Sequence, residues 1–454
     1  MKKRIVILGS GESGTGAALL AQHLGYDVFV SDKGPIKEQY KQELNVHGIA
    51  WEENQHSMDK ILTASQVIKS PGIPEKSEVI KALREWGTEV FGEIEFAFRH
   101  AGKCQIVAIT GSNGKTTTTE LCYHLLKNAG LNARKGGNVG NSFARMVLDD
   151  IVDKKVKDGS RIFVLEISSF QLDDTLDFKP KIAILLNITP DHLDRYDYSL
   201  EKYAASKFRI TLNQGRGDKF IYNGFDPVIK SNFEHGIANR EANGLKPKDI
   251  AIRKSFYKNG FIKIGKDLFD MQASQLKGSH NMFNAACALR ASILLGADKE
   301  RLAESLNTFS TPPHRLEKVA EINGVTWIND SKATNVDAVF YALQSMETPV
   351  VWIVGGQDKG NDYEVLKKLV KRKVNTIICM GLDNTKIIKA FKSLNKKMVE
   401  TKSAEEAVQQ ASKYAKSGYT VLLSPACASF DLFKNYEDRG NQFKQAVKSL
   451  TINH

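Results

Sequence analysis

A glycine-rich segment that ends in lysine and threonine is the most informative part of this 454-residue chain. Residues 106–119 read I-V-A-I-T-G-S-N-G-K-T-T-T-T. An apolar strand leads into a turn and then a helix, so backbone N–H groups at the helix start point at phosphate oxygens. Lys115 would place a positive charge on the terminal phosphates, and the Thr116 hydroxyl would bind Mg²⁺. Ile109 stands where the usual motif has its first glycine, so this is a shortened phosphate-binding loop; the alternative is an ordinary turn before a helix.

A second glycine loop occurs near the start of the chain. Residues 9–14 read G-S-G-E-S-G after the apolar run Ile5–Leu8, a helical pattern follows from about Thr15 to Leu24, and Asp32 ends the next strand. This order matches the dinucleotide fingerprint, so an NAD-dependent oxidoreductase is a rival interpretation. Such a loop binds any diphosphate, however, and Glu12 is unfavourable near phosphates. The glycines could also serve only the close packing of strand and helix.

Polar residues follow two further strands that lie downstream of the phosphate loop. Glu166 lies near the end of the apolar run Ile162–Ile167, and His192 lies in N-I-T-P-D-H-L-D-R-Y, directly after Ile182–Leu186. Sites of α/β proteins form where parallel strands end, so we expect these side chains near the loop. The carboxylate of Glu166 suits Mg²⁺. Taken singly, Glu166 also fits a buried polar pair, and His192 also fits a capping or core histidine.

Three other segments contain polar residues whose roles the pattern leaves open. Lys207 lies on a predicted helix and by itself fits a surface lysine. Asn281 and Asn284 are one turn apart at a helix start, where they would contact a nucleotide or cap the helix. Arg315 follows the Thr-Pro-Pro linker at 311–313, and an arginine at a domain junction suits a phosphate or a carboxylate.

The elements that must position these residues form three α/β blocks along the chain. Short apolar strands alternate with helical patterns, which indicates parallel sheets with right-handed crossovers. The other predicted strands are Val28–Val30, Val67–Lys69, Gln105–Ile109, Phe261–Ile264, Val325–Ile328, Val350–Val354, Thr376–Met380 and Thr420–Leu423, with a further short pattern around Ile252. The stretch Asn232–Gly260 is largely polar, and we assign it no role.

Composition narrows the class of protein. The net charge of +12 comes from scattered lysines, and no basic run is interleaved with aromatic residues, so we expect no nucleic-acid partner. Five dispersed cysteines without a C-x-x-C pair favour reduced thiols and a cytoplasmic location. The basic start resembles a signal peptide, but its apolar run of residues 5–8 is too short. We expect no membrane partner.

Taken together, the motifs resemble those of the Mur ligase family over nearly the whole chain. The family-type strings are T-G-S-N-G-K-T, E-I-S-S-F-Q-L, N-I-T-P-D-H-L-D-R-Y and H-N-M-F-N-A. Four later strings are similar to those of the members that add D-glutamate: P-H-R-L-E (313–317), I-N-D-S-K-A-T-N (328–335), L-S-P-A-C-A-S-F-D (423–431) and K-N-Y-E-D-R-G (434–440).

The resemblance implies a three-domain α/β fold. Residues 1–100 would form a Rossmann-like domain that binds the UDP-substrate. Residues 101–311 would form a central P-loop ATPase-like domain with a mostly parallel sheet. Residues 312–454 would form a Rossmann-like domain that binds D-glutamate.

The resemblance also implies which residues form each site. Those for the UDP-substrate are Gly11, Ser13, Gly14, Thr15, Asp32, Ser70, Pro71, Gly72, Asn138 and His192. Those for ATP are Gly111, Ser112, Asn113, Gly114, Lys115, Thr116, Thr117, Asn281, Arg315, Asp330 and Lys332. Two Mg²⁺ sites would use Thr116, Glu166, His192 and Lys207, the last as a carbamate. D-Glutamate would contact Thr334, Lys359, Ser429 and Tyr436, although Tyr436 stands where the family commonly has phenylalanine.

The activity implied by the resemblance is ATP-dependent amide formation between UDP-N-acetylmuramoyl-L-alanine and D-glutamate. Lys115, Glu166, His192 and Lys207 would be the catalytic residues, and we expect a monomer. Three rivals differ in class: a related ligase with another amino-acid substrate, such as a folylpolyglutamate-type enzyme; an NAD oxidoreductase; and a catalytically inactive nucleotide-binding regulator. The D-glutamate-type strings argue against the related ligase. The additional phosphate loop at residues 110–116 argues against the oxidoreductase, and the intact catalytic set argues against the inactive regulator.

Overall fold

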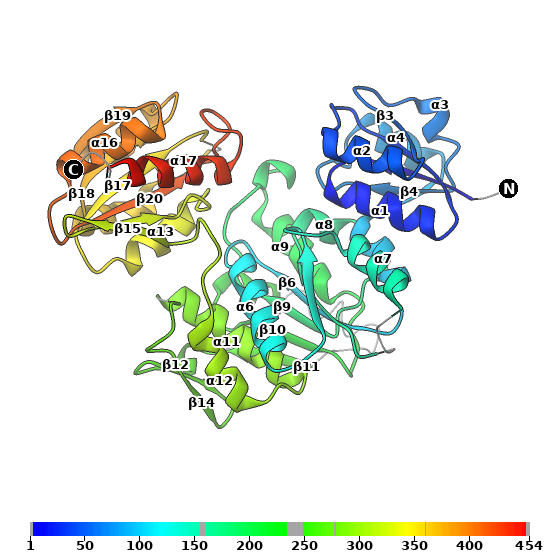
Figure 1. Ribbon diagram of the computed structural model, residues 1–454, viewed down its shortest axis with the longest axis horizontal. Coiled ribbons are helices and arrows are strands. Elements are labelled where there is room, and N and C mark those ends of the chain that lie inside the picture. The colour runs from blue at the N-terminus through cyan, green and yellow to red at the C-terminus, as the bar shows by residue number, and fades with distance from the viewer. Residues whose placement is uncertain (1–2, 155–158, 234–247, 277, 359, 451–454) are drawn as a thin grey trace. The chain divides into compact units, whose positions relative to one another are not determined.

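The computed structural model describes residues 3–154, 159–233, 248–276, 278–358 and 360–450. They form two compact units, one of Met1–Ala273 and Phe283–Thr308 and the other of Ser274–Met282 and Phe309–His454 (Figure 1). The described residues contain one five-stranded sheet, two six-stranded sheets and one three-stranded sheet. The α/β class expected from the sequence is confirmed. The domain boundaries after residues 100 and 311 stay a prediction.

The first sheet is parallel and has the order β3-β2-β1-β4-β5. Its strands are β1 (Arg4–Leu8), β2 (Asp27–Ser31), β3 (Ala50–Glu52), β4 (Gln66–Lys69) and β5 (Glu89–Gly92). The helices are α1 (Glu12–His23), α2 (Glu38–Val46), α3 (Met58–Ile61), α4 (Glu78–Glu85) and α5 (Glu93–His100). Helices α1 and α5 contribute to the core on one face, and α3 and α4 contribute to the core on the other. The chain reverses its order of strands beside β1, where such sheets bind ligands.

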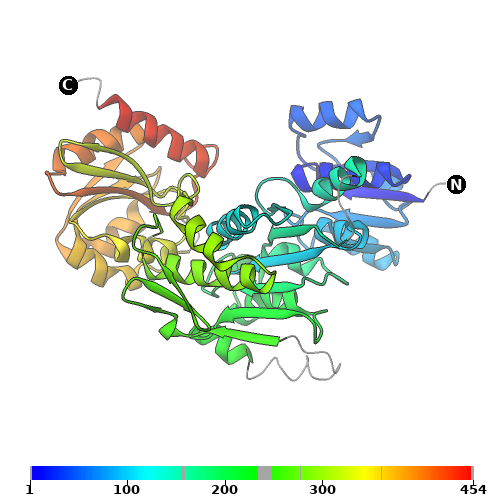
Figure 2. The ribbon, with the colours of Figure 1, turned by 60° about the horizontal axis from the view of Figure 1, so that its bottom comes forward.

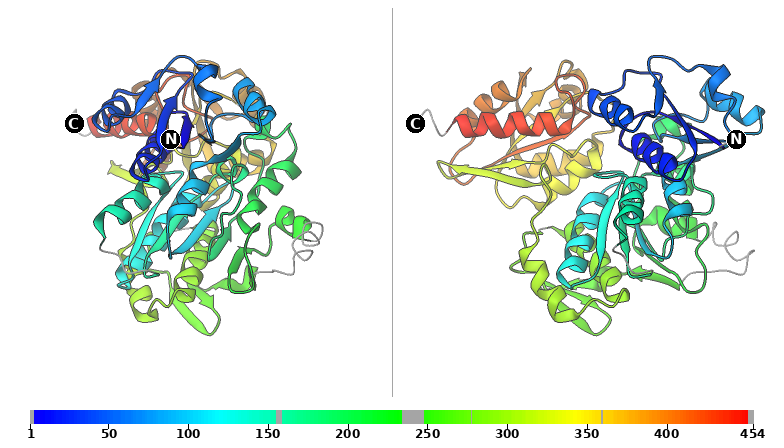
Figure 3. Two further views of the ribbon diagram at one scale, coloured as in Figure 1. Left: turned by 90° about the vertical axis from the view of Figure 1, so that its right-hand side faces the viewer. Right: turned by 45° about the vertical axis from the view of Figure 1, so that its right-hand side comes forward.

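The second sheet is also parallel, with the order β11-β10-β9-β6-β8-β7 (Figure 3). Its strands are β6 (Gln105–Thr110), β7 (Ala133–Gly137), β8 (Ile162–Glu166), β9 (Ile182–Leu185), β10 (Lys219–Asn223) and β11 (Lys248–Ile252). Strands β6, β8 and β9 are completely buried except for Gln105, which explains their continuous apolar sequences.

Helices cover this second sheet and connect it to the first. They are α6 (Lys115–Asn128), α7 (Phe143–Asp153), α8 (Ser169–Asp173), η1 (Leu193–Arg195), α9 (Leu200–Phe208), η2 (Arg209–Thr211), α11 (Ser279–Leu294) and α12 (Lys299–Thr308), and α6 lies beside α12 (Figure 2). Helix α1 packs closely on α7, because a side chain at Gly16 would begin 2.1 Å from the Ser142 hydroxyl. The two sheets of this unit therefore share one apolar core.

A small antiparallel sheet follows the second sheet in the chain. Its strands are β12 (Tyr257–Lys258), β13 (Phe261–Ile264) and β14 (Asp267–Asp270), preceded by η3 (Lys254–Phe256). The sequence indicates β13 but not its two partners, and much of the preceding stretch, 234–247, lies outside the described residues.

The sheet of the second unit has the order β15-β16-β20-β17-β18-β19. Its strands are β15 (Glu317–Ile322), β16 (Val325–Asn329), β17 (Val350–Gly355), β18 (Val374–Met380), β19 (Lys397–Thr401) and β20 (Thr420–Ala426). The core of one face contains residues from α13 (Val336–Ser345), η4 (Glu364–Leu366), α14 (Lys367–Lys373) and α15 (Thr385–Phe391), which precedes η5 (Lys392–Leu394). The core of the other face contains residues from α16 (Ala404–Tyr414) and α17 (Tyr436–Ser449) (Figure 1).

One edge of this sheet differs from the parallel arrangement that the alternation of strands and helices predicts. Strands β15 and β16 pair antiparallel, because a turn at Asn323 and Gly324 joins them directly. Both turn residues have positive φ, which lets a short turn reverse the chain without a crossover helix. Among the described residues, no helix is both long enough and apolar enough to span a bilayer.

Candidate active site

The order of strands brings the three predicted catalytic segments to one sheet edge. Strands β9, β6 and β8 are adjacent, and all are parallel, so the segments after them leave from the same edge. Lys115 follows β6, Glu166 ends β8 and His192 follows β9. The expectation that these segments share an edge is confirmed.

The phosphate loop has the backbone geometry that its glycines permit. Gly111 has φ of 154° and Gly114 has φ of 85°, and Gly114 is the residue directly before helix α6. A side chain at Gly114 would begin 2.6 Å from the Asn284 amide oxygen. The Lys115 amine donates hydrogen bonds to the carbonyls of Gly111 (2.7 Å) and Ser112 (2.9 Å). The amine therefore lies over the concave side of its own loop.

The segment after β9 holds the phosphate loop in place. The Ser112 hydroxyl donates to the Thr189 carbonyl (2.8 Å) and accepts from the Thr189 N–H (2.9 Å). The Asn187 side chain accepts from the Asn113 N–H (2.8 Å) and donates to the Asn113 carbonyl (3.0 Å). The motif that contains His192 thus also shapes the loop, a role that sequence analysis did not identify.

Glu166 is buried at the end of β8, with 3% of its surface exposed. The Asn138 amide donates to Glu166 Oε1 (2.9 Å), and the Asn138 N–H donates to the Glu166 carbonyl (2.8 Å). A buried carboxylate held by one amide presents its charge in a fixed direction. The structure therefore brings together Asn138, predicted for the UDP-substrate, and Glu166, predicted for the metal.

Lys207 is buried on α9, with 1% of its surface exposed. Its amine donates to the Gly111 carbonyl (3.0 Å) and lies 4.4 Å from the centroid of the Tyr203 ring. Burial lowers the pKa of Lys207 well below its usual value, and the charge of Lys115 lowers it further. The surface-lysine interpretation is wrong, since this amine contacts the phosphate loop.

His192 lies in a left-handed turn, with φ of 52°, and its side chain is exposed. Its ring packs edge-on against Phe170 with the centroids 5.2 Å apart, and its Nε2 lies 3.6 Å from the carboxylate of Asp191. Phe170 also stacks under the guanidinium of Arg195. His192 is therefore not a core histidine.

These residues fit a hard cation that also binds phosphate oxygens and water. Thr116 and Glu166 supply a hydroxyl and a carboxylate from two adjacent strand ends. Mg²⁺ characteristically uses only one or two protein carboxylates beside substrate phosphates. Within the described ranges, no group of three or more His, Cys, Asp or Glu residues could hold a metal ion by itself, so the nucleotide would complete the coordination.

The polar groups of the first glycine loop form hydrogen bonds within the protein itself. Asp32 accepts from the Ser10 N–H (2.8 Å), the Ser10 hydroxyl (2.7 Å) and the Gly34 N–H (2.9 Å). Gly14 is buried, and a side chain there would begin 1.9 Å from the Gly9 carbonyl. Close packing thus explains Gly14, whereas Gly11 is exposed with open space around it.

Glu12 of the first glycine loop has its partners at the start of α7. Its carboxylate accepts from the Ser142 N–H (3.0 Å) and from Arg145 Nε (2.9 Å) at the start of α7. Arg145 also pairs with Glu43. The loop can therefore carry a glutamate without exposing its charge to a phosphate.

The segment Ser70–Gly72 lies beside the first glycine loop. The Ser70 N–H donates to the Leu8 carbonyl (2.8 Å), and a side chain at Gly9 would begin 2.5 Å from the Ser70 hydroxyl. The other predicted residues of this sheet are Ser13, which is partly exposed in the first turn of α1, and Thr15, which is buried and donates to the Ser10 carbonyl (3.1 Å). The two loops are therefore neighbours where the strand order reverses beside β1.

Several residues predicted for ATP lie at the start of the second unit. Asp330, which follows β16, is buried and accepts from the Ser424 hydroxyl (2.8 Å) and the Leu316 N–H (3.2 Å). Burial raises its pKa to about 7, although these hydrogen bonds and the charge of Arg315 oppose the rise. The Lys332 amine lies 4.9 Å from the centroid of the Tyr436 ring.

Buried Arg439 connects the D-glutamate-type strings, and sequence analysis gave it no role. Its guanidinium donates to the Ser331 hydroxyl (2.9 Å), the Ser331 carbonyl (2.8 Å) and the Cys427 carbonyl (3.2 Å). The Ser331 hydroxyl in turn donates to the Tyr436 carbonyl (2.8 Å). Sequence analysis predicted no ligand for this arginine of the string 434–440. That fact is the signal that could have indicated its role in joining the strings.

The predicted D-glutamate residues are only partly placed. Thr334 is exposed, Ser429 is buried and Tyr436 starts α17. Lys359 lies outside the described residues. Asn281 and Asn284 on α11 are both buried. Asn284, which the candidate set for ATP omitted, lies against the phosphate loop, because a side chain at Gly114 would begin 2.6 Å from its amide oxygen.

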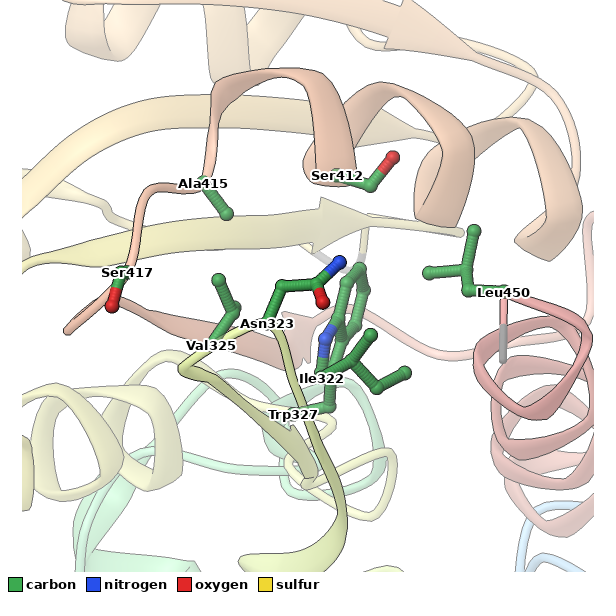
Figure 4. A pocket seen from close by; sticks show the side chains of 8 residues that line it. All are labelled: Ile322, Asn323, Val325, Trp327, Ser412, Ala415, Ser417 and Leu450. Carbon is green, nitrogen blue, oxygen red and sulfur yellow. The ribbon is translucent and has the colours of Figure 1, made fainter. Parts of the chain in front are cut away.

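A cavity in the second unit lies apart from these residues. It is lined by Ile322, Asn323, Val325, Trp327, Ser412, Ala415, Ser417 and Leu450 (Figure 4). Val325 begins β16, whereas Asp330 follows its other end, and five strand residues span about 17 Å. The cavity therefore belongs to the opposite edge of the sheet from the candidate residues.

Comparison with known proteins defines the class. Family models match three successive segments: the MurD N-terminal domain at residues 4–79, the Mur ligase middle domain at 109–292, and the Mur ligase glutamate ligase domain at 314–427. The fold, the phosphate loop and these matches show that the chain belongs to the Mur ligase family.

Curated relatives match over the full length. UDP-N-acetylmuramoylalanine--D-glutamate ligase of Christiangramia forsetii is 51% identical, with 99% of this chain and 100% of the relative covered. The enzyme of the same name from Cytophaga hutchinsonii is 50% identical over 99% and 100% of the two chains.

Solved structures show the same fold at much lower identity. MurF of Acinetobacter baumannii has a TM-score of 0.61 at 14% identity, covering 99% of this chain and 93% of its own. MurF ligase of Thermotoga maritima in complex with ADP has a TM-score of 0.58 at 16% identity, covering 93% and 95%.

Proposed function

We propose that this protein is an ATP-dependent ligase that joins D-glutamate to UDP-N-acetylmuramoyl-L-alanine in peptidoglycan precursor synthesis. The observation that carries the proposal is the shared edge of β9, β6 and β8, where Lys115, Glu166 and Lys207 surround a phosphate loop. Full-length identity of 50–51% to ligases of that name supports the choice of both substrates. Five cysteines that are all free thiols support a cytoplasmic location.

The reaction needs little covalent chemistry from the protein. The alanyl carboxylate attacks the γ-phosphorus of ATP and forms an acyl phosphate while ADP leaves. The amine of D-glutamate then attacks the acyl carbon, phosphate leaves, and the amine loses a proton. Positioning and charge neutralisation account for most of such catalysis. Lys115 would neutralise the transferring phosphoryl group, and Asn138 would orient Glu166.

One Mg²⁺ would be held by Thr116 together with ATP, and a second by Glu166, His192 and carbamylated Lys207. When bound, Mg²⁺ would neutralise the phosphate charge. A plain ammonium at Lys207 would repel a cation, whereas a carbamate would supply anionic oxygen ligands. The lowered pKa of Lys207 supports this modification, because carbamylation requires a neutral amine.

The other sites would use the residues that the resemblance to the family implies. The first glycine loop, Asp32 and Ser70–Gly72 would hold the UDP group. Arg315, Asp330, Lys332 and Asn281 would contact ATP, and Thr334, Lys359, Ser429 and Tyr436 would contact D-glutamate. A buried charged hydrogen bond from Lys359 to a glutamate carboxylate would contribute roughly 1.5–3 kcal/mol.

The decisive experiment measures phosphate release from ATP with both substrates and Mg²⁺, and with each component omitted in turn. We expect release only from the complete mixture. Robust NAD reduction, or equal turnover with L-lysine in place of D-glutamate, would contradict the proposal.

The Lys207 modification has its own test. Lys207→Ala should lose most activity but keep UDP-substrate binding, and a small added carboxylate should partly restore turnover. Lys207→Arg should not recover activity, because a guanidinium cannot form the carbamate. An unmodified amine in a crystal structure of the active, Mg²⁺-bound enzyme would refute the modification.

A further inference from the structure

A buried ion pair connects the loop Ser70–Gly72 to the segment that follows α8. Lys69 ends β4 and Asp174 follows α8, and their side chains are 3–4% exposed. The Lys69 amine lies 2.8 Å from the Asp174 carboxylate. Neither residue belongs to the sets predicted for substrate, nucleotide or metal.

The same lysine closes the turn that it precedes. Its amine donates to the Ile73 carbonyl (3.0 Å), and the Ile73 N–H donates to the Ser70 carbonyl (3.0 Å). The exposed Glu75 carboxylate lies further away, at 3.7 Å from the amine. The turn Ser70–Ile73 is therefore held by one backbone hydrogen bond and by a lysine whose direction Asp174 determines.

Asp174 is itself anchored to the first sheet. Its carbonyl accepts from the Gly92 N–H (2.8 Å) at the end of β5, the neighbour of β4. A side chain at Gly92 would begin 2.9 Å from the Asp174 Cβ, so the contact needs a glycine. Just beyond it, buried Glu95 accepts from the N–H groups of Leu176, Asp177 and Phe178. The segment after α8 is thus docked rigidly on the first sheet.

The other end of this segment leads to the candidate catalytic groups. Asp174 follows Glu166 by eight positions (174 − 166), with only α8 between them. The carbonyl of Ser169 on α8 accepts from the hydroxyl of Ser206, the residue before Lys207 (3.0 Å). A displacement of Asp174 would therefore be transmitted to the edge that carries Glu166 and Lys207.

A second contact supports the same loop from the motif after β9. The Arg195 guanidinium donates to the Gly72 carbonyl (3.2 Å) and lies close to that of Pro71 (3.5 Å). Two segments that carry candidate catalytic residues, those after β8 and β9, thus each hold the loop Ser70–Gly72.

We propose that Lys69 and Asp174 are positioning residues, which hold the loop Ser70–Gly72 at a fixed place relative to β8 so that a UDP-linked carboxylate bound by the first sheet meets the phosphate loop. The inference rests on the proposed function, because it assigns Ser70–Gly72 to the UDP group. Lys69 makes no direct contact with the reacting atoms. Substitution of Lys69 should therefore raise the KM for the UDP-substrate rather than the KM for ATP.

The test uses the full chain and two single variants. Lys69→Met removes both the ion pair and the bond to Ile73, so we expect the KM for the UDP-substrate to rise about tenfold, a ratio that corresponds to ~1.4 kcal/mol. Asp174→Asn keeps the lysine, so its rise should be smaller. The KM for ATP should stay within about twofold in both.

The double variant Lys69→Met/Asp174→Leu separates positioning from stability. Replacing both members of a buried pair by apolar residues is often neutral or stabilising, whereas removing one is costly. We expect the Tm to recover relative to Lys69→Met while the KM for the UDP-substrate stays high. If KM recovered together with Tm, the pair would be only structural and the proposal would be wrong.

A matched control is Glu43→Gln. Glu43 on α2 pairs with Arg145 on α7, as Lys69 pairs with Asp174, and neither member of this control pair belongs to the segment 69–73. Its KM values should stay at those of the unmodified protein. Titration calorimetry with UDP should show weakened binding in Lys69→Met but not in Glu43→Gln, and equal UDP binding in the two would overturn the inference. Because turnover of the unmodified protein is measured first, failure of the proposed function would be seen separately.

Discussion

The glycine loops after β1 and β6 both leave an interior parallel strand and both start a helix. The polar groups of the two loops have different partners. In the first loop, Ser10 donates twice to Asp32 and Glu12 pairs with Arg145, so its carboxylates already have partners within the protein. In the second, the Lys115 amine lies on the carbonyls of its own loop, where a phosphate would compete for it. The two loops therefore differ in the cation that the second one carries rather than in the spacing of their glycines, and we expect that cation to mark the loop for phosphoryl transfer.

The largest expected effect tests the second loop. Lys115→Ala should lower kcat by roughly 10²–10³, the range observed when one group that stabilises transition-state charge is removed. Phosphate release under saturating substrates would measure it. Lys127→Ala, an exposed lysine near the end of the same helix, is the control and should keep normal turnover. Near-normal activity of Lys115→Ala would mean that the loop is only structural.

Two alanine substitutions should distinguish a tightly packed position of the first loop from an open one. Gly14→Ala forces a Cβ to 1.9 Å from the Gly9 carbonyl, so we expect the free energy of unfolding to fall by about 1–3 kcal/mol. Gly11→Ala has open space and should stay within about 0.5 kcal/mol. Urea unfolding measures both. Equal stabilities would contradict the packing described for Gly14.

Asp32→Asn should affect only the first loop. The side chain accepts three hydrogen bonds, from Ser10 and Gly34, and an amide cannot accept all of them. We expect the KM for the UDP-substrate to rise about tenfold, or ~1.4 kcal/mol, with the KM for ATP unchanged. Asp27→Asn is the control, because Asp27 is an exposed aspartate at the start of β2, the strand that Asp32 follows. A rise in the KM for ATP of the same size would mean that the two loops are not independent.

The last comparison concerns the pH dependence of stability, which a buried carboxyl beside the first loop should produce. Burial raises the pKa of Glu93 to about 8, and the charge of Glu12 adds to the rise. Above pH ~4.5 the unfolded chain loses this proton, whereas the folded chain keeps it until pH ~8, so stability should fall with rising pH by at most ~1.4 kcal/mol per unit.

Glu93→Gln removes that contribution while an amide oxygen can still accept from the Ala144 N–H. The variant's stability should therefore fall less between pH 5 and pH 8 than that of the unmodified protein. Urea unfolding at pH 5, 6, 7 and 8 measures the slopes. Parallel profiles would show that Glu93 is ionised in the folded protein.

Sequence patterns predicted most interior strands but missed β10 (Lys219–Asn223), and they missed most edge strands. Fully buried β6, β8 and β9 are continuous apolar runs, so their residues alone identify them. The edge strands β3 and β7 lack that signal because they are partly exposed. The same holds for β15 and β19, which lie at the two ends of the sheet of the second unit. Their pairing with a neighbour, rather than their own composition, makes them strands.

Local sequence by itself determined the two glycine loops, the helices that they start and the order of elements along the chain, because each depends on residues within a few positions of one another. Only the tertiary structure decided that Lys207 is buried against Gly111, that Asn284 lies against the phosphate loop, and that Lys69 pairs with Asp174. These contacts join residues that are distant in the chain. Burial and charge pairing of that kind depend on how the strands are ordered in the sheets, which no short stretch of sequence contains.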